Sequence, residues 1–217
     1  MKVVTRKRAP LAVADELLRF AAEFSLAVPD YFLTISLAET GKRLVNLCVL
    51  KRLTIAGAES VTGGMIASRL TDTPGASGFF QGATVAYTRE AKISVLGIPA
   101  ALISKRGVVS ADVAREMAKR ARMLFNADLA YATTGFAGPE GGSPDEPPVG
   151  TVYAALAKGS TGSRKLEKPL AWRCDFKDAS REAVRDMATE FVIRALFLLC
   201  LNDAAQRAEL STGDQEG

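Results

Sequence analysis

The sequence predicts an α/β fold in which helices cover both faces of one mixed, mostly parallel sheet. From residue 53 onward, short apolar runs of strand length alternate with runs of helical periodicity. Alternation of this kind is typical of strands joined by helices that pack on the sheet. The last two strand-like runs are joined only by a Gly/Ser/Lys turn around residues 158–165, which indicates an antiparallel hairpin. A length of 217 residues suits one domain, or one domain with an appendage.

The first 35 residues are expected to form an amino-terminal extension, residues 1–35, that is partly helical and has no assigned role. Its beginning, residues 1–10, is expected to be disordered. Apolar side chains at helical spacing predict a helix over residues 11–24. Pro29 and Asp30 then break the segment.

The main domain is expected over residues 36–202, and it begins with a helix at about 37–51. Strands are expected at residues 53–58, 83–88, 128–134, 149–157 and 168–176. Helices are expected at residues 63–72, 90–96, 110–125 and 179–201. Ser110 is a suitable N-cap for the third of these helices. Residues 203–217 are polar and are expected to form a frayed tail.

The composition argues against metal and nucleic-acid chemistry. The chain has no histidine and its three cysteines lack Cys-x-x-Cys spacing, so no metal site is expected. The net charge of +4 is mild, and much of it comes from a basic start at residues 2–8 that we interpret as a solvated tail. Because no other basic stripe with interleaved aromatics follows, we expect no nucleic-acid partner. We expect no cofactor either.

Cysteine usage and the apolar segments favour a cytoplasmic protein. An odd number of cysteines in unrelated contexts fits the reducing cytosol. Asp15, Glu16 and Arg19 interrupt any apolar region of a signal peptide. The most apolar stretch, residues 191–201, is too short to span a bilayer and carries Arg194. We interpret it as a buried carboxyl-terminal helix and expect no membrane association.

A Glu-Ser-Val-Thr-Gly-Gly turn at residues 59–64 is the first candidate for a catalytic site. A strand-like run leads into it and a helix-like run leads out, which places Ser60 at the carboxyl end of a strand. Open α/β sheets bind ligands at this end, and helix amino termini suit an oxyanion or a phosphate. Simple helix capping is the competing interpretation. Because histidine is absent, a catalytic serine here needs another base.

Lys92 is the candidate for that base. It ends a Tyr-Thr-Arg-Glu-Ala-Lys segment, residues 87–92, that follows the second predicted strand and opens a helix. A free lysine has a pKa of about 10.4, so service near neutral pH requires a fall of about three units. Burial in a narrow cleft beside a helix amino terminus favours that fall, because both effects disfavour the ammonium form. A solvated charge is the competing interpretation.

A second glycine-rich loop, residues 133–144, leaves the strand predicted at 128–134. Glycines let a backbone approach a ligand closely. On its own, the segment is better explained as a long surface loop. Two such loops that both leave carboxyl strand ends are expected to line one crevice.

Taken in order, these segments resemble the carboxyl-terminal domain of the CinA family. That family carries a Glu-Ser-Cys-Thr-Gly-Gly turn, a Thr-Tyr-x-x-x-Ala-Lys segment, a Thr-Gly-Ile-Ala-Gly-Pro-x-Gly-Gly loop and a Lys-Pro-Val-Gly-Thr-Val strand. The counterparts here are residues 59–64, 85–92, 134–142 and 148–152. The similarity covers roughly residues 36–201.

The resemblance implies a three-layer α/β/α sandwich and a Ser/Lys amidohydrolase. Its substrate would be nicotinamide mononucleotide, deamidated to nicotinate mononucleotide and ammonia in pyridine nucleotide salvage. By this resemblance Ser60 is the nucleophile and Lys92 is the general base. Main-chain N–H groups around Thr62, Gly63 and Gly64 are candidates for stabilising the oxyanion.

The same resemblance implies a pocket for a small-molecule nucleotide. The residues expected around that nucleotide are Tyr87, Gly135, Ala137, Gly138 and Arg181. Arg185 is a second candidate for binding the phosphate. A homodimer is an expectation at the level of the family.

The chain departs from the family pattern in the loop at residues 143–148, which is longer than the common form, and at two further places near the expected site. Val61 stands where the family has cysteine. In the family's Phe-x-Gly-Asp-Arg-x-x-Val-Arg segment, Ala179 and Ser180 replace Gly-Asp, with one residue added. Two other functions therefore stay open. One is a catalytically idle interaction protein linked to competence or DNA damage, and the other is an amidase for a different small amide.

Overall fold

The structure, a computed structural model, describes residues 10–141, 146–159 and 168–213. The basic start at residues 2–8, the last part of the second glycine-rich loop and most of the turn around residues 158–165 lie outside the described residues. The expectations for those segments remain predictions.

Within the described residues, five strands form one sheet in the order β2-β1-β3-β4-β5. They are β1 (Ile55–Glu59), β2 (Phe80–Val85), β3 (Leu129–Gly135), β4 (Thr151–Lys158) and β5 (Leu170–Asp175). β1 pairs in parallel with β2 and β3, whereas β4 pairs antiparallel with β3 and β5. Of these strands only β4 is reversed, which confirms the mixed, mostly parallel sheet and the predicted hairpin.

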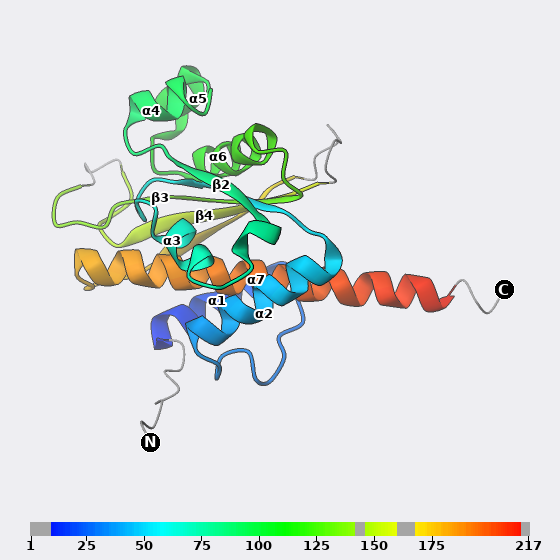
Figure 1. The fold of residues 1–217 in the computed structure, drawn as a ribbon. Helices are drawn as coiled ribbons and strands as arrows, with labels where there is room; N and C mark the ends of the chain where they lie inside the picture. Colours follow the sequence, from blue (N-terminus) through cyan, green and yellow to red (C-terminus); the bar gives the residue numbers. More distant parts are fainter. Residues whose placement is uncertain (1–9, 142–145, 160–167, 214–217) are drawn as a thin grey trace.

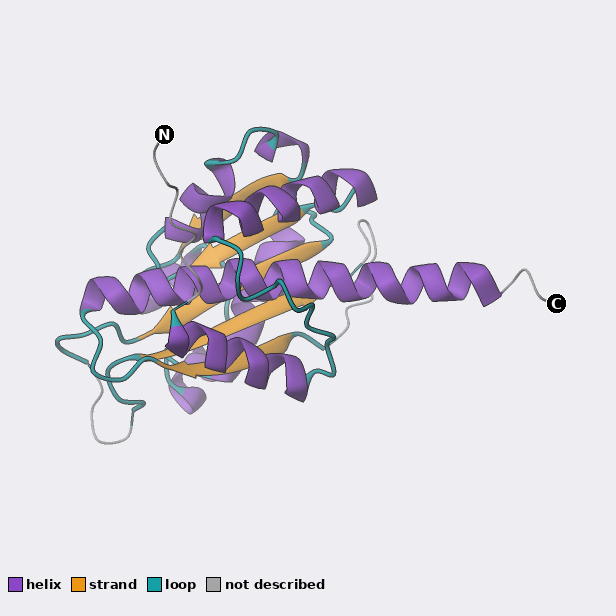
Figure 2. Ribbon diagram, turned by 90° about the horizontal axis from the view of Figure 1, so that it is seen from below, coloured by secondary structure: helices purple, strands orange, loops and turns teal. Residues whose placement is uncertain are grey.

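One face of the sheet is covered by a layer that contains the longest helix (Figure 1). Its members are α1 (Leu11–Glu23), α2 (Leu37–Lys51), α3 (Met65–Thr71) and α7 (Arg181–Gly213), and a 3-10 turn at Ala76–Gly78 follows α3. The strands turn large buried side chains to this face, among them Ile55, Leu129, Tyr131 and Leu156. Figure 2 shows α7 lying across the strands on this side.

The opposite face carries α4 (Arg89–Ser94), α5 (Ala100–Arg106) and α6 (Ala111–Leu124) (Figure 1). The sheet turns small residues to this face: Ala56, Ala58, Ala130, Ala132, Ala155 and Ala157. The buried side of α6 is also rich in alanine, so the helix and the sheet pack with short side chains between them. The predicted N-cap of α6 is confirmed, because Ser110 Oγ accepts a hydrogen bond from Val113 N. The three-layer α/β/α architecture is therefore present.

The amino-terminal segment packs into the α7 layer. Its buried apolar residues are Val13, Leu17, Phe20, Ala21 and Phe32. The buried Glu16 carboxylate accepts hydrogen bonds from Trp172 Nε1 at 2.9 Å and from Asp175 N at 3.2 Å. These bonds attach α1 to the edge strand β5. Residues 10–35, which were expected only as an extension, thus complete the core of the main domain.

Two elements of the middle of the chain differ from expectation. β2 occupies residues 80–85 rather than 83–88. The strand stops early because Thr88 caps α4, where its hydroxyl accepts a hydrogen bond from Ala91 N at 3.0 Å. α5 is not among the predicted helices, because its seven residues after Pro99 are too few to show a periodicity.

The carboxyl-terminal helix is longer than expected. α7 continues to Gly213, so residues 203–213 are helical, whereas a frayed tail was expected from 203. No glycine or proline interrupts residues 202–212, and alanine, glutamine, arginine and glutamate there all favour a helix. None of the described helices has the length and apolar character needed to cross a membrane.

Candidate active site

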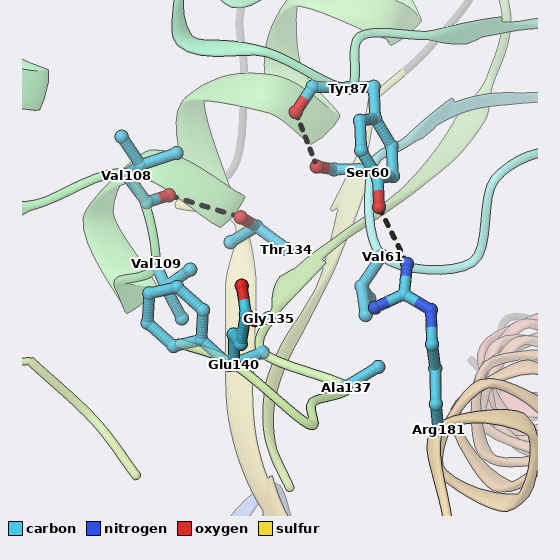
Figure 3. Close-up of a pocket in the computed structure, with 11 residues that line it drawn as sticks. Ser60, Val61, Tyr87, Val108, Val109, Thr134, Gly135, Ala137, Glu140 and Arg181 are labelled. Atoms are coloured by element: carbon cyan, nitrogen blue, oxygen red, sulfur yellow. Dashed lines mark hydrogen bonds between the residues drawn. The ribbon is translucent and has the colours of Figure 1, made fainter. Parts of the chain in front are cut away.

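The carboxyl ends of β1, β2 and β3 meet at one edge of the sheet, beside a cavity of about 230 Å³ (Figure 3). Each strand is followed by a segment that lines the cavity: Ser60 after β1, Tyr87 after β2 and Phe136 after β3. Arg181 approaches from the start of α7. The two glycine-rich loops therefore line one crevice, as the sequence predicts.

Ser60 and Lys92 are in hydrogen-bond contact. Lys92 Nζ donates to Ser60 Oγ at 2.8 Å. Ser60 lines the cavity, whereas Lys92 is fully buried. That burial lowers the pKa of the Lys92 ammonium to about 8, and within the described residues no carboxylate lies close enough to form an ion pair with it. The lysine is thus poised to be neutral in mildly alkaline solution.

The surroundings of Lys92 Nζ suit an amine that accepts a proton. Besides Ser60 Oγ, its neighbours are the carbonyl oxygens of Ala86 at 2.9 Å and Tyr87 at 3.3 Å. A neutral amine has two N–H groups and one lone pair. When the two carbonyls accept both N–H groups, the lone pair faces the Ser60 hydroxyl. The geometry therefore fits a general base directed at that serine.

Local sequence explains how Lys92 reaches this position. α4 begins directly after its Thr88 cap, and Lys92 N donates to Thr88 O at 3.1 Å. Lys92 therefore stands one helical turn beyond the cap. Long side chains in helices point back toward the amino terminus, which here is the end of β2.

Glu59, the last residue of β1, occupies the amino end of α3 from inside the protein. Its carboxylate is fully buried and accepts hydrogen bonds from Gly64 N at 2.8 Å, Ala67 N at 2.8 Å and Ile66 N at 3.3 Å. The free N–H groups at the start of α3, which were expected to bind a ligand, therefore donate to this side chain. The anion at the start of α3 is part of the protein.

Two hydroxyl groups complete the environment of the Glu59 carboxylate. Thr62 Oγ1 donates at 2.7 Å and Tyr131 Oη at 3.0 Å. Burial and the nearby negative charge of Glu59 raise the pKa of Tyr131 well above its usual value, so its phenol stays a donor. Thr62 also shares a hydrogen bond of 2.8 Å with Thr133 Oγ1 on β3. The serine turn is thus attached to two neighbouring strands.

These bonds change the set of candidate oxyanion donors. Gly63 N donates to Ser60 O at 3.1 Å and Gly64 N to Glu59, so both N–H groups are engaged. In the part of the chain that the structure describes, the N–H groups of Val61 and Thr62 donate to no acceptor. Val61 lines the cavity beside Ser60. Among the described residues of the serine turn, Val61 and Thr62 therefore supply the main-chain N–H groups that are still available to an oxyanion.

Arg181 joins two walls of the cavity. Its guanidinium donates to Tyr87 Oη at 2.8 Å, which Figure 3 shows, and to Gly138 O at 2.7 Å. Arg181 itself is exposed, so its cationic group is accessible at the rim. The altered loop before α7 still delivers an arginine to the pocket, even though Asp178 there adopts a positive φ of 57°.

Arg185, the second candidate for binding a phosphate, has a different place. It lies one turn further along α7 and donates to Val61 O at 3.2 Å and to Thr62 O at 3.1 Å. It is not among the residues that line the cavity. Its cationic group holds the carbonyl oxygens of the serine turn instead.

Close packing explains why glycine occupies two positions of the second loop. A Cβ on Gly135 would lie 2.6 Å from Thr151 O, and one on Gly138 would lie 2.6 Å from a methyl group of Val149. Gly135 and Ala137 line the cavity, whereas Gly138 contributes its carbonyl oxygen to Arg181. Close packing therefore accounts for both glycines.

Sequence reasoning missed several residues of this site. Val108 and Val109 also line the cavity, and no role was predicted for either of them. The roles of Glu59 and Arg185 were missed as well. A glutamate at the end of an apolar strand is an unusual pattern and could have directed attention to Glu59, whereas nothing local distinguishes Arg185.

Most of the chain matches a known protein family. The model of the CinA C-terminal domain family matches residues 37–200. A CinA-like protein from Geobacter sulfurreducens is 58% identical over 107 residues, which is 49% of this chain and 26% of that protein. A CinA-like protein from Citrifermentans bemidjiense is 45% identical over 161 residues, or 74% of this chain and 38% of that protein. The chain spans about a quarter to two fifths of the length of these curated relatives.

Solved structures of similar size share the fold. A competence-damaged protein (CinA) superfamily protein from Klebsiella pneumoniae has a TM-score of 0.69 and 30% identity, over 76% of this chain and 98% of that one. The competence/damage inducible protein CihA from Agrobacterium tumefaciens has a TM-score of 0.68 and 32% identity, over 76% of this chain and 94% of that one.

Proposed function

This chain belongs to the CinA C-terminal domain family, and from that premise we propose that it is a serine amidohydrolase. Its proposed substrate is nicotinamide mononucleotide, which it deamidates to nicotinate mononucleotide and ammonia. The observation that carries the proposal is the 2.8 Å contact between Ser60 Oγ and the buried Lys92 Nζ. The cavity beside the pair is open to a small molecule and lies where α/β sheets bind ligands.

The first half of the reaction forms an acyl-enzyme. Ser60 Oγ attacks the carboxamide carbon while its proton passes to the Lys92 amine. The carbonyl oxygen becomes an oxyanion, which the N–H groups of Val61 and Thr62 stabilise; one such donor is typically worth about 3 kcal/mol. The intermediate then expels the amide nitrogen. That nitrogen takes the proton from the Lys92 ammonium and leaves as ammonia.

The second half releases the acid. A water molecule attacks the ester carbon and gives its proton to Lys92, and the second tetrahedral intermediate expels Ser60 Oγ. The lysine returns the proton to the serine, so the enzyme is restored, and the carboxylic acid product loses its remaining proton to the solvent to become a carboxylate. No metal or cofactor enters this scheme.

Arg181 and Tyr87 are the proposed contacts for the rest of the nucleotide. The exposed guanidinium of Arg181 lies at the rim of the cavity and suits a phosphate. The Tyr87 ring stands next to Arg181, with its hydroxyl hydrogen-bonded to the guanidinium, and can lie against a ribose or a pyridine ring (Figure 3). We assign the phosphate to Arg181 rather than to Arg185, because Arg185 is committed to the carbonyls of the serine turn.

The proposal extends to the compartment. The three cysteines, Cys48, Cys174 and Cys200, are buried and free. Burial and nearby negative charge raise the pKa of the Cys174 thiol, which keeps it protonated and unreactive. These features support a protein that works in the reducing cytoplasm.

The first test is ammonia release from nicotinamide mononucleotide by the purified protein. Ser60→Ala should abolish it, and Ser77→Ala, at an exposed serine outside the site, should leave it unchanged. No release by a folded wild type would favour an idle interaction protein, and release only from another carboxamide would favour a retargeted amidase. Equal activity in Ser60→Ala and wild type would contradict the serine mechanism.

A further inference from the structure

We propose that Glu59 is a positioning residue for the reaction at Ser60. This inference rests on the proposed function. It assigns a role in catalysis to a side chain that touches neither the substrate cavity nor the reacting atoms. The buried carboxylate holds the turn between β1 and α3 in the form that directs Ser60 toward Lys92 and leaves the Val61 N–H available to an oxyanion.

The isolation of Glu59 from the cavity is the first argument. Its side chain is fully buried and does not line the cavity, and its carboxylate makes no hydrogen bond to Ser60 or Lys92. Each of its oxygens already accepts from at least two donors. A carboxylate occupied in this way is not placed to exchange a proton with a substrate.

The bonds that Glu59 makes are the second argument, because they connect the nucleophile's neighbours to fixed elements. Three donors belong to Gly64, Ile66 and Ala67 at the start of α3. A fourth is the hydroxyl of Thr62 within the turn, and a fifth is the phenol of Tyr131 on β3. The carboxylate therefore joins β1, β3, α3 and the turn at a single point.

The backbone of the turn shows why such a fastening is needed. Gly63 and Gly64 adopt positive φ angles of 60° and 95°. Glycine adopts such angles without steric cost, but it adopts other angles as readily, so the glycines alone do not fix the conformation of the turn. On the outer side, the Arg185 guanidinium binds the carbonyls of Val61 and Thr62. Glu59 binds the N–H and hydroxyl groups from within, so opposite charges hold the two sides of a flexible turn.

The charge of Glu59, and not only its shape, matters for this role. All five partners are donors, so both oxygens have to accept. Glu59→Gln keeps the length but turns an NH₂ group toward at least one main-chain N–H, which cannot accept a hydrogen bond, so that contact becomes repulsive and the turn loosens. The serine is then no longer aligned with Lys92 and with the oxyanion donors. We expect this misalignment to lower kcat and to leave KM nearly unchanged.

The test compares Glu59→Gln with Glu16→Gln, which removes a buried carboxylate that binds Trp172 and the Asp175 N–H on β5. The first readout is kcat and KM for nicotinamide mononucleotide. The second is the rate at which phenylmethylsulfonyl fluoride sulfonylates Ser60, followed by mass spectrometry. In that step Ser60 Oγ bonds to sulfur, fluoride leaves and the proton passes to Lys92.

We expect Glu59→Gln to lower kcat and the labelling rate by about tenfold or more beyond Glu16→Gln, with KM within about twofold of wild type. An effect no larger than that of Glu16→Gln, or a rise in KM with kcat preserved, would overturn the role. The labelling readout needs no substrate. A wild type that is labelled but does not release ammonia would refute the proposed substrate, while the positioning role is still decided by the labelling rates.

Should Glu59→Gln fail to fold, Thr62 supplies the second comparison. Thr62→Ser keeps the hydroxyl that donates to Glu59 at 2.7 Å, and Thr62→Val removes it at nearly constant volume. Labelling at least about threefold slower in Thr62→Val than in Thr62→Ser supports the proposal, since the same carboxylate has lost one anchor to the turn. Equal labelling rates would overturn it.

Discussion

Lys92 Nζ lies 2.8 Å from Ser60 Oγ, although the two residues are 32 positions apart in the chain. Ser60 is the first residue after β1, and Lys92 stands in α4, the helix that follows the neighbouring parallel strand β2. Parallel pairing of β1 with β2 brings the two carboxyl ends to the same edge of the sheet. The contact is therefore a consequence of the strand topology.

Replacing the proposed base should remove activity without unfolding the protein. Lys92→Met keeps the length and apolar stem but has no amine, so we expect a loss of about 10²–10⁴-fold in kcat for ammonia release. The melting temperature should not fall, because a buried amine is costly to desolvate. Lys105→Met, at an exposed lysine, is the control. Near wild-type turnover by Lys92→Met would refute the assignment.

The pH dependence of activity should follow the neutral fraction of Lys92. Burial lowers its pKa to about 8, so the amine is protonated and inactive as a base at lower pH. We expect kcat/KM to rise about tenfold per pH unit up to that midpoint and then to level off. A profile that falls with rising pH between 6 and 8, roughly the range below the midpoint, would contradict this role.

The same group should affect stability with a defined sign. The pKa of Lys92 is lowered from 10.5 in the unfolded chain to about 8, so between these values the unfolded state binds more protons. Its unfavourable contribution is complete below the folded pKa and is relieved as the pH rises toward the unfolded pKa. Urea unfolding should therefore show a stability gain of Lys92→Met over wild type that is larger at low than at high pH across this window. An equal gain at both ends would argue against the lowered pKa.

Arg181 should matter for the phosphate of the substrate. Arg181→Gln is expected to raise KM for nicotinamide mononucleotide by roughly tenfold, because a charge-assisted hydrogen bond is lost. The KM for nicotinamide riboside, which has no phosphate, should change much less. Tyr87→Phe removes the 2.8 Å bond from Arg181 but leaves the guanidinium, and so controls for changes in the cavity wall. Equal losses on both substrates would mean that Arg181 only shapes the cavity.

The amino-terminal segment should contribute to stability and not to turnover. Glu16→Gln disturbs the hydrogen bonds to Trp172 Nε1 and Asp175 N, and we expect the free energy of unfolding in urea to fall by about 1–3 kcal/mol. Glu23→Gln, at the exposed end of α1, should be nearly neutral. A change in kcat for Glu16→Gln at constant temperature would contradict a purely structural role.

Much of the fold follows from local patterns. The strand and helix periodicities predicted most of the elements in order, and the short turn around residues 158–165 predicted that the last two strands pair antiparallel. The motifs around Ser60 and Lys92 predicted a pair at one sheet edge. These features depend on short segments and on the general rule that ligands meet the carboxyl ends of parallel strands. Boundaries were less accurate, as at β2, because a cap such as Thr88 competes with the strand for the same residues.

What the sequence by itself determined is therefore the α/β class, the family resemblance and the chemical identity of the serine and lysine. Only the tertiary structure decided how each group is used. The Glu59 carboxylate binds the amino end of α3, where a ligand was expected. Arg185 binds a carbonyl oxygen of the serine turn and not the substrate. Side chains within residues 10–35 pack in the hydrophobic core. These relationships depend on contacts between residues distant in the chain. Hydrogen-bond partners and burial arise when separate elements pack, and no local spacing encodes them.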